Sequence, residues 1–424
     1  MKKPSLKLVF IIFLLNFQNL YGAEVWSNLP PQSKVFFAIG GDQQFVYEKG
    51  KVTKPASRAK LLTEQMGLSL LGADYIPAIN VSWNQGSSES TIQDLTLSSH
   101  GAPEFDPVAL IQLLKARGVR TILGEIQIET SRIQKPADMR ASKDSGYCYN
   151  AKPAVLNFQQ NCVSLHITSR GAQIADPDLD VNVRLDLQMG ASYNGTRPHF
   201  VWLDSSKTEF EYVITTHLKN SSSAVDVDVV VPDTTKWMKN KIIRMASQEG
   251  IEWNPNRTAS GKQIEVAIAG GDIGNVLCSA LRDSSNLYAD SVFGMVPQAN
   301  RRSFLNQYEA SLVDGSGLSA SNKISGAGLL LMLTQIQENR FFNFYQQCLP
   351  SPGTGTLESR LSRMRGRLIA KTGSLSGLTN LAGYFKNRSG QWLPFVFLLE
   401  HESMKVSDLR KLQDQILEQI LATY

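Results

Sequence analysis

Three short motifs that lie far apart in this 424-residue chain constrain its fold more than any other feature. Residues 57–60 read S-R-A-K, residues 284–286 read S-S-N, and residues 371–373 read K-T-G. Each motif alone is weak, because a serine with a lysine three residues later is most simply a helix cap beside a solvated lysine. A hydroxyl and two amines from such distant stretches can act together only if the fold brings them into one cleft.

The first motif has the context that a serine nucleophile requires. Pro55 and Ala56 precede a helical pattern that ends at Gly72, so Ser57 and Lys60 should lie on one face of the first helical turn. A serine hydroxyl is a weak nucleophile at neutral pH, so we expect burial or a nearby cation to lower the pKa of its lysine base. The backbone N–H of the serine, at the helix start, can donate to an oxyanion.

The other two motifs supply the remaining groups of an acyl-transfer site. Ser284 and Asn286 follow a predicted helix and are separated by one residue, so we expect the serine to relay protons and the asparagine to hold a substrate amide. The K-T-G motif closes a predicted strand that begins at residue 367. There Lys371, also the candidate second cation, and Thr372 would bind a carboxylate, Gly373 would admit the substrate backbone, and the Ser374 N–H would complete the oxyanion hole.

Together with V-D-G-S-G-L-S at residues 313–319, these motifs resemble the D-alanyl-D-alanine carboxypeptidase/endopeptidase family of the penicillin-binding protein 4 type, peptidase family S13. The resemblance implies an α/β (α+β) fold, the penicillin-binding protein/serine β-lactamase-like transpeptidase fold, with large inserted mixed α/β domains. We expect the catalytic domain at residues 24–81 and 262–424 and the insertion at residues 82–261. The implied partners are peptidoglycan peptides and β-lactam antibiotics, and no cofactor is implied.

Two departures from the family pattern keep other functions open. Ala320 stands where the family often has a basic residue, and Ser376 stands where it has a larger polar one. These changes favour, as an alternative, a catalytically quiet peptidoglycan-binding protein. A β-lactamase is a second alternative, although the long interval between the first two motifs argues against its compact class A form.

The first 23 residues predict export to the periplasm. Lys2, Lys3 and Lys7 precede an apolar run from residue 8 to residue 17, and charged Glu24 follows Ala23. The run is short of the ~20 apolar residues that a bilayer span needs, so we favour a cleaved signal over a membrane anchor. Cleavage removes three lysines and no acid, which lowers the formal charge from +5 to +2. Such a charge does not indicate nucleic-acid binding.

The cysteines and histidines do not form a metal motif, so no metal is expected. Cys148 and Cys162 lie in a polar, loop-like segment, where a disulfide could close a modest loop. Cys278 lies in an apolar helical stretch and is expected to be core, and whether it pairs with Cys348 is left open. The sequence leaves a homo-oligomer open.

Local patterns predict further elements. We expect a β-hairpin over residues 34–47, helices capped at Asp106 and at Asp233 or Thr234, and a C-terminal amphipathic helix begun by Ser407. The two capped helices are expected to end at Gly118 and Gly250. Further helices are predicted over residues 273–281 and 329–337. Strands are predicted over residues 179–189, 225–231, 367–372 and 392–399.

Overall fold

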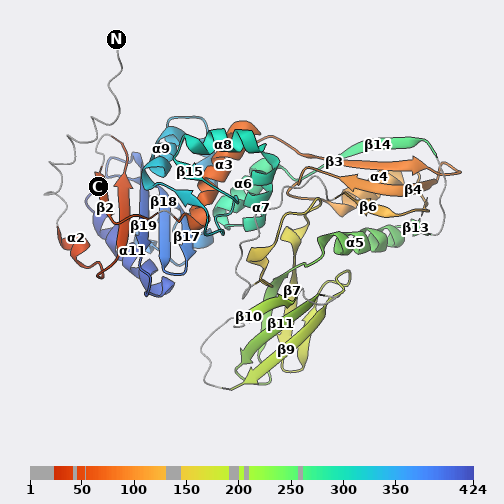
Figure 1. The fold of residues 1–424 in the computed structure, drawn as a ribbon, viewed down its shortest axis with the longest axis horizontal. Coiled ribbons are helices and arrows are strands. Elements are labelled where there is room, and N and C mark those ends of the chain that lie inside the picture. The colour runs from red at the N-terminus through yellow and green to blue at the C-terminus, as the bar shows by residue number, and fades with distance from the viewer. Residues whose placement is uncertain are drawn as a thin grey trace, which may run out of the picture.

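The computed structural model describes residues 23–41, 45–52, 54–129, 145–190, 200–204, 210–255 and 261–424. Figure 1 shows an α/β body from which the chain runs out into an extended β-rich part and then returns. The proposed secretory signal, residues 1–22 in particular, lies outside the described residues. In the part of the chain that is described, no helix is long and apolar enough to cross a membrane.

The body is built on a five-stranded antiparallel sheet that joins the two ends of the chain. Its strands, in spatial order, are β17 (Leu368–Leu375), β18 (Leu378–Lys386), β19 (Trp392–Glu400), β1 (Lys34–Ile39) and β2 (Phe45–Lys49). Strand β17, which carries the K-T-G motif, is therefore an edge strand. β1 and β2 form the predicted hairpin, although residues 42–44 of its turn lie outside the described residues.

Alternation along β1 divides the core of the body into two layers. Phe36 and Ala38 pack with the helices on one face of the sheet, whereas Val35, Phe37 and Ile39 pack with α11 (Val406–Leu421) on the other. The helical layer contains α3 (Ala59–Leu70), α6 (Ile273–Arg282), α7 (Asn286–Met295), α8 (Gln298–Asn306), α9 (Gly326–Gln337) and α10 (Phe342–Cys348). In that layer, α3 is buried on all sides from residue 59 to residue 68.

The extended part begins and ends in one mixed sheet. That sheet has the order β13-β5-β4-β3-β14, with β6 paired to β4. Its strands are β3 (Ala78–Gln85), β4 (Thr91–Ser98), β5 (Thr121–Ile122), β6 (Ile126–Ile128), β13 (Glu252–Trp253) and β14 (Gln263–Ala269). Helices α4 (Pro107–Ala116) and α5 (Thr234–Gln248) pack on it.

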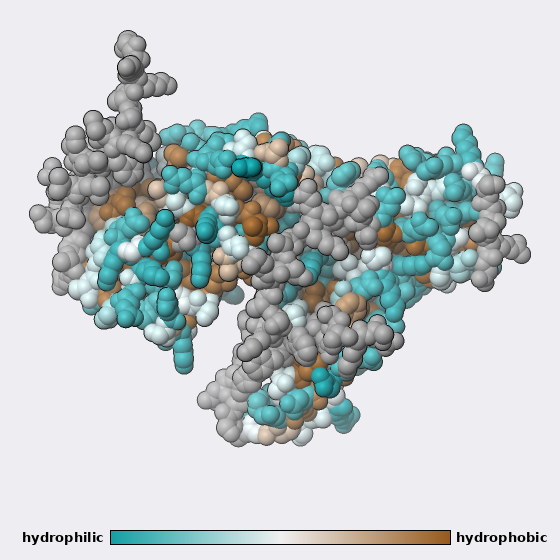
Figure 2. Space-filling view, viewed as in Figure 1, coloured by the Kyte–Doolittle hydropathy of each residue, from teal (hydrophilic) through white to brown (hydrophobic). Residues whose placement is uncertain are grey.

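Two smaller three-stranded sheets complete the extended part (Figure 1). One has the order β12-β7-β8 and the other β10-β11-β9. Their strands are β7 (Cys162–Thr168), β8 (Gly171–Ile174), β9 (Asn182–Met189), β10 (Phe200–Asp204), β11 (Glu211–Leu218) and β12 (Ala224–Val230). On the face drawn in Figure 2, the described surface is mostly hydrophilic, with hydrophobic residues in small separate patches.

Sheet membership gives a natural way to name the two parts. Because β3 and β14 pair with each other, we call residues 78–269 the insert, and the described residues before and after them the body. The predicted insertion at 82–261 began inside β3 and ended just before β14, so it left β14 in the catalytic domain. The division into separate domains stays a prediction.

Several local predictions are confirmed. Asp106 accepts a hydrogen bond from the Val108 N–H at the start of α4, and Asp233 accepts one from the Lys236 N–H at the start of α5. Gly118 and Gly250 follow the two helices with φ of +76° and +77°. These are left-handed conformations that glycine adopts without strain.

Other predictions were wrong or incomplete. Helix α11 begins at Val406 with Lys405 as its N-cap, so Ser407 lies inside the first turn. Cys278 was expected to be simple core, but it forms a disulfide with Cys348, across a sequence separation of 70. Strand β18 was not predicted. The Cys148–Cys162 disulfide is present as expected.

Candidate active site

The first motif lies where the sequence placed it, at the entrance to the central helix. Residues 56–58 form a single 3-10 turn that runs directly into α3. The Lys60 Nζ lies 3.2 Å from the Ser57 Oγ, which is hydrogen-bond distance. Lys60 is fully buried, whereas Ser57 is half-buried and reaches a cavity.

Lys60 donates hydrogen bonds to three neutral oxygens. Besides Ser57, its Nζ lies 2.6 Å from the Asn286 Oδ1 and 2.9 Å from the Ser316 carbonyl oxygen. An ammonium group has three N–H bonds, so these acceptors satisfy all of them. The amine is therefore held in one position, with one N–H directed at the nucleophile.

The Ser316 carbonyl is a contact that the sequence did not predict, although the D-G-S-G-L-S stretch was part of the resemblance. Buried Asp314 organises this turn by accepting hydrogen bonds from the backbone N–H groups of Gly317 and Ser319 at 2.7 and 2.8 Å. At Gly317, φ is +84°, and an added Cβ would lie 1.9 Å from the Ala56 oxygen. The turn therefore packs directly against the start of the nucleophile helix.

The second motif occupies the junction between α6 and α7. Ser284 has a φ of 64°, an uncommon left-handed conformation for a residue other than glycine. Ser285 caps α7, and Asn286 is its first residue. Ser284 lines the same cavity as Ser57, yet within the described residues it forms no hydrogen bond to Ser57, Lys60 or Lys371. Its role as a proton relay stays a prediction.

The third motif runs along the edge strand β17. Lys371 is fully buried and donates to the Thr372 carbonyl at 3.2 Å, while the Thr372 hydroxyl donates to the Thr356 hydroxyl at 2.8 Å. Burial holds the pKa of Lys371 well below its usual value, and the nearby positive charge of Lys60 lowers it further. Lys60 therefore acts electrostatically on Lys371 without a direct hydrogen bond, and the expected lowering of the pKa of Lys60 by Lys371 stays a prediction.

Gly373 also allows a close approach that the sequence did not predict, while its role in admitting the substrate backbone stays a prediction. An added Cβ would lie 3.2 Å from the backbone nitrogens of both Ser57 and Arg58. The glycine thus lets β17 approach the N–H of the nucleophile, which has no hydrogen-bond acceptor within the described part of the chain. Because β17 is an edge strand, the N–H groups on its outer side have no neighbouring strand to pair with among the described residues.

All three motifs contribute to one cavity of about 350 Å³. Its lining residues are Ser57, Ser284, Thr356, Arg360, Thr372, Gly373, Ser374 and Arg410. Arg410, from α11, donates through Nε to the Ser374 hydroxyl at 3.1 Å. Arg360 forms an ion pair with Asp414 at 2.6 Å. The cavity therefore combines the candidate nucleophile Ser57 with hydroxyl and guanidinium groups of the kind that bind carboxylates.

Two buried charged side chains near the first motif were not anticipated. Arg58 is fully buried, and burial lowers its pKa to about 9. Glu64, one turn after Lys60, is also fully buried, and neither carboxyl oxygen has a hydrogen-bond partner among the described residues. Burial raises the pKa of Glu64 well above its usual value, against the opposing charges of Lys60 and Lys371.

Metal chemistry has no evident site in the regions that are described, where no cluster of three or more His, Cys, Asp or Glu residues could hold an ion. The protein groups alone provide a nucleophile, a lysine within reach of it and a set of N–H donors. This combination suits acyl transfer through a covalent serine ester.

Comparison with known proteins agrees with this chemistry. Residues 41–420 match the model of the D-Ala-D-Ala carboxypeptidase 3 (S13) family. The D-alanyl-D-alanine carboxypeptidase DacB of Haemophilus influenzae is 25% identical over 329 residues, which cover 68% of this chain and 67% of that protein. The crystal structure of penicillin binding protein 4 from the same organism has a TM-score of 0.77 at 20% identity, covering 94% of this chain and 98% of that one. Its complex with a β-lactam has a TM-score of 0.73, with the same identity and coverage.

Proposed function

The chain belongs to the D-Ala-D-Ala carboxypeptidase 3 (S13) family, and on this premise we propose that Ser57 is the nucleophile that cleaves the terminal D-alanyl bond. The activity of the protein is that of a serine-type D-Ala-D-Ala carboxypeptidase. The observation that carries the assignment of the residue is the 3.2 Å contact between the Ser57 hydroxyl and a buried lysine.

In the first step, the Ser57 Oγ attacks the carbonyl carbon of the penultimate D-alanine, and its proton passes to Lys60 in the neutral form. The tetrahedral oxyanion accepts hydrogen bonds from the backbone N–H groups of Ser57 and Ser374. The carbon–nitrogen bond then breaks, and the leaving amine takes a proton from Lys60 through Ser284. Water hydrolyses the resulting ester and restores the serine hydroxyl.

Substrate binding depends on the third motif and on the arginines beside it. Thr372 and Ser374 present hydroxyl groups to the cavity, and Arg410 provides positive charge near the position of a terminal carboxylate, with Lys371 as a further hydrogen-bond donor. Asn286 would hold the peptide amide through the second N–H of its side-chain amide, because its Oδ1 accepts from Lys60 and its other N–H donates to the Tyr149 carbonyl. The substrate is the D-alanyl end of a peptidoglycan stem peptide.

β-Lactams would acylate the same serine, because their strained amide occupies the place of the D-alanyl bond. This is supported by the β-lactam complex of the Haemophilus influenzae relative. We extend the proposal to endopeptidase action on cross-linked peptides, because a cross-link also follows a D-alanine carbonyl. The proposed location is the periplasm, in agreement with the charged and apolar segments before Glu24.

Labelling with a fluorescent penicillin tests the assignment. The protein should become covalently labelled, whereas Ser57→Ala should not, because the ester cannot form. Release of D-alanine from a pentapeptide, measured on the same preparations, separates a working peptidase from a quiet binding protein. Undiminished labelling of Ser57→Ala would refute the assignment of the nucleophile, and digestion of purified cross-linked muropeptides tests the endopeptidase activity.

A further inference from the structure

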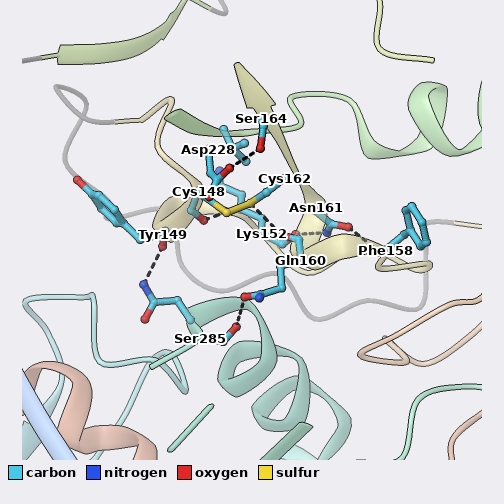
Figure 3. The surroundings of a disulfide bond; sticks show 12 residues. Cys148, Tyr149, Lys152, Phe158, Gln160, Asn161, Cys162, Ser164, Asp228 and Ser285 are labelled. Atoms are coloured by element: carbon cyan, nitrogen blue, oxygen red, sulfur yellow. Dashed lines mark hydrogen bonds between the residues drawn. A yellow bond between two sulfur atoms is a disulfide. The ribbon is translucent and has the colours of Figure 1, made fainter. Parts of the chain in front are cut away.

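A loop of the insert contacts the second catalytic motif at two points (Figure 3). This loop, residues 148–162, is closed by the Cys148–Cys162 disulfide. Its Tyr149 carbonyl accepts a hydrogen bond from the Asn286 Nδ2 at 2.7 Å, and its Gln160 Oε1 accepts one from the Ser285 hydroxyl at 2.7 Å. The two motif residues that these contacts hold are themselves buried.

The contact with Tyr149 fixes the orientation of a catalytic amide. Because the Asn286 Nδ2 donates to this carbonyl, the Oδ1 atom faces the Lys60 amine, to which it lies at 2.6 Å. A flipped amide would direct its NH₂ group at the ammonium, which has no lone pair to accept a hydrogen bond. The carbonyl from the insert therefore selects the productive amide orientation.

The contact with Gln160 fixes the backbone that precedes this amide. The Ser285 Oγ donates to Gln160 and also accepts a hydrogen bond from the Tyr288 N–H at 3.4 Å, as the N-cap of α7. Ser284, the adjacent residue, is in a left-handed conformation and lines the cavity. Such a conformation persists only when its surroundings hold it.

The loop is tied together by several internal contacts. Besides the disulfide, Gln159, Gln160 and Asn161 all have left-handed φ values, of 47°, 55° and 54°. The Asn161 side chain donates to the Asn157 Oδ1 at 2.8 Å and to the Lys152 carbonyl at 3.0 Å, which ties the turn together from inside. The loop therefore presents Gln160 and the Tyr149 carbonyl in a fixed relation.

We propose that the disulfide-closed loop at residues 148–162 is a positioning element for the reaction, and that Gln160 is its positioning residue. The inference rests on the proposed function of Ser57 and Lys60. It gives the insert a part in catalysis: it holds the second motif from outside the body. Removing either contact lets Ser284 and Asn286 relax and slows the step in which the ester forms.

The matched pair Gln160→Met and Gln159→Met tests this proposal. Both change a glutamine in the same strained turn, but the Gln159 side chain is exposed and has no partner among the described residues. Loss of one hydrogen bond should lower the limiting rate of penicillin acylation by about 5- to 30-fold in Gln160→Met. The penicillin-binding constant should stay unchanged, and Gln159→Met should acylate as fast as the parent.

A conservative variant separates positioning from general damage. Gln160→Glu keeps an acceptor oxygen for the Ser285 hydroxyl and should restore most of the rate, while the melting temperatures of Gln160→Met and Gln160→Glu should agree. Rates are counted per active molecule by titration with labelled penicillin. Equal acylation rates in Gln160→Met and the parent would overturn the inference, and failure of the parent itself to label would instead overturn the proposed function.

The disulfide provides an independent test in the full-length protein. Replacing Cys148 and Cys162 together with serine frees both contacts, so the acylation rate should fall by about 10- to 100-fold, as expected when catalytic groups lose their alignment. Acylation at the parent rate in a folded Cys148→Ser/Cys162→Ser protein would also overturn the inference. If this variant does not fold, the Gln160 series still decides.

Discussion

The insert and the body both bury lysines, but they surround them differently. In the insert, Lys241 forms ion pairs with Asp176 at 2.9 Å and Asp178 at 2.7 Å. In the body, Lys60 donates to three neutral oxygens. Lys371 donates to a backbone carbonyl, with no ion pair among the described residues.

Under the proposed mechanism, this difference separates a structural lysine from a functional one. Carboxylates beside Lys241 form ion pairs with it, which suits a group that only has to hold two elements together. Neutral acceptors around Lys60 hold its amine beside the Ser57 hydroxyl, which suits a group proposed to exchange a proton with it. The same side chain thus serves two purposes because of the oxygens around it.

The largest expected effect comes from exchanging each lysine for methionine. Lys60→Met should lower the penicillin acylation rate by about 100- to 10,000-fold, because it removes the proton acceptor. Lys241→Met should instead lower the free energy of unfolding by about 1 to 3 kcal/mol, because Asp176 and Asp178 lose a buried hydrogen-bonding cation, although Arg244 still binds Asp178. Stopped-flow labelling and urea unfolding measure the two effects.

The comparison would fail if the two lysines behaved alike. A Lys241→Met protein that is folded but acylates as slowly as Lys60→Met would show that the insert charge takes part in the reaction. A Lys60→Met protein that acylates at the parent rate would remove the proposed base.

A second pair of substitutions concerns glycines. At Gly373 an added methyl group would meet the N–H of Ser57, so Gly373→Ala should slow acylation by about 10- to 100-fold through misalignment of the oxyanion donors. At Gly250, in the insert, no atom lies within 4 Å but φ is +77°, so Gly250→Ala should cost about 1 kcal/mol of stability and leave the acylation rate unchanged. Labelling kinetics and thermal unfolding distinguish the two, and slow acylation in Gly250→Ala would contradict the assignment.

The sequence predicted those parts of the site that are local or that carry a residue-type signature. The helical spacing of Ser57 and Lys60 placed them in contact, and the K-T-G motif placed Lys371 near them. The Ser316 carbonyl could not be predicted, because any residue has such an oxygen and only the tertiary structure selects it. The contact of Gln160 with Ser285 could not be predicted either, because it joins residues that are 125 positions apart in the sequence.

In the fold, too, the sequence predicted the features that depend on nearby residues. It predicted the two helices with aspartate caps and glycine ends, because these signals lie within a few residues of each helix end. Strand β18 was missed because eight of its nine residues are buried, so it lacks the alternation of a half-buried strand. The Cys278–Cys348 pairing was left open because spacing alone does not reveal connectivity.

The acids of the two regions should respond to pH in opposite directions. Burial raises the pKa of Glu64 above 4.5, so the stability it contributes is complete below pH 4.5 and is lost as pH rises through its folded-state pKa. Burial also acts on Asp178, but hydrogen bonds from Arg244 and Lys241 and their charges outweigh it and lower its pKa below 3.8. Its contribution is present above pH 3.8 and is lost as pH falls.

Non-titrating amides test these signs. Relative to the parent, Glu64→Gln should gain stability as pH rises above 4.5, by at most about 1.4 kcal/mol per pH unit. Asp178→Asn should be destabilised at neutral pH, and that deficit should shrink in acid. Urea unfolding at a series of pH values between about 3 and 8 measures the free energy of unfolding of each variant as a function of pH. Parallel curves for the two variants would contradict the assigned pKa shifts.

The smallest expected effect concerns the arginines. Arg410 reaches the cavity and donates to Ser374, whereas Arg244 in the insert binds Asp178 through Nε and Nη2 at 2.7 and 2.8 Å. Arg410→Gln should raise the KM for D-alanine release about 3- to 10-fold with little change in kcat, because an exposed charge contributes about 1 kcal/mol to binding a carboxylate. Arg244→Gln should change stability and leave KM unaltered. An unchanged KM in Arg410→Gln would place the carboxylate on the K-T-G hydroxyls and Lys371 alone, and would limit the role of α11 to packing against the sheet.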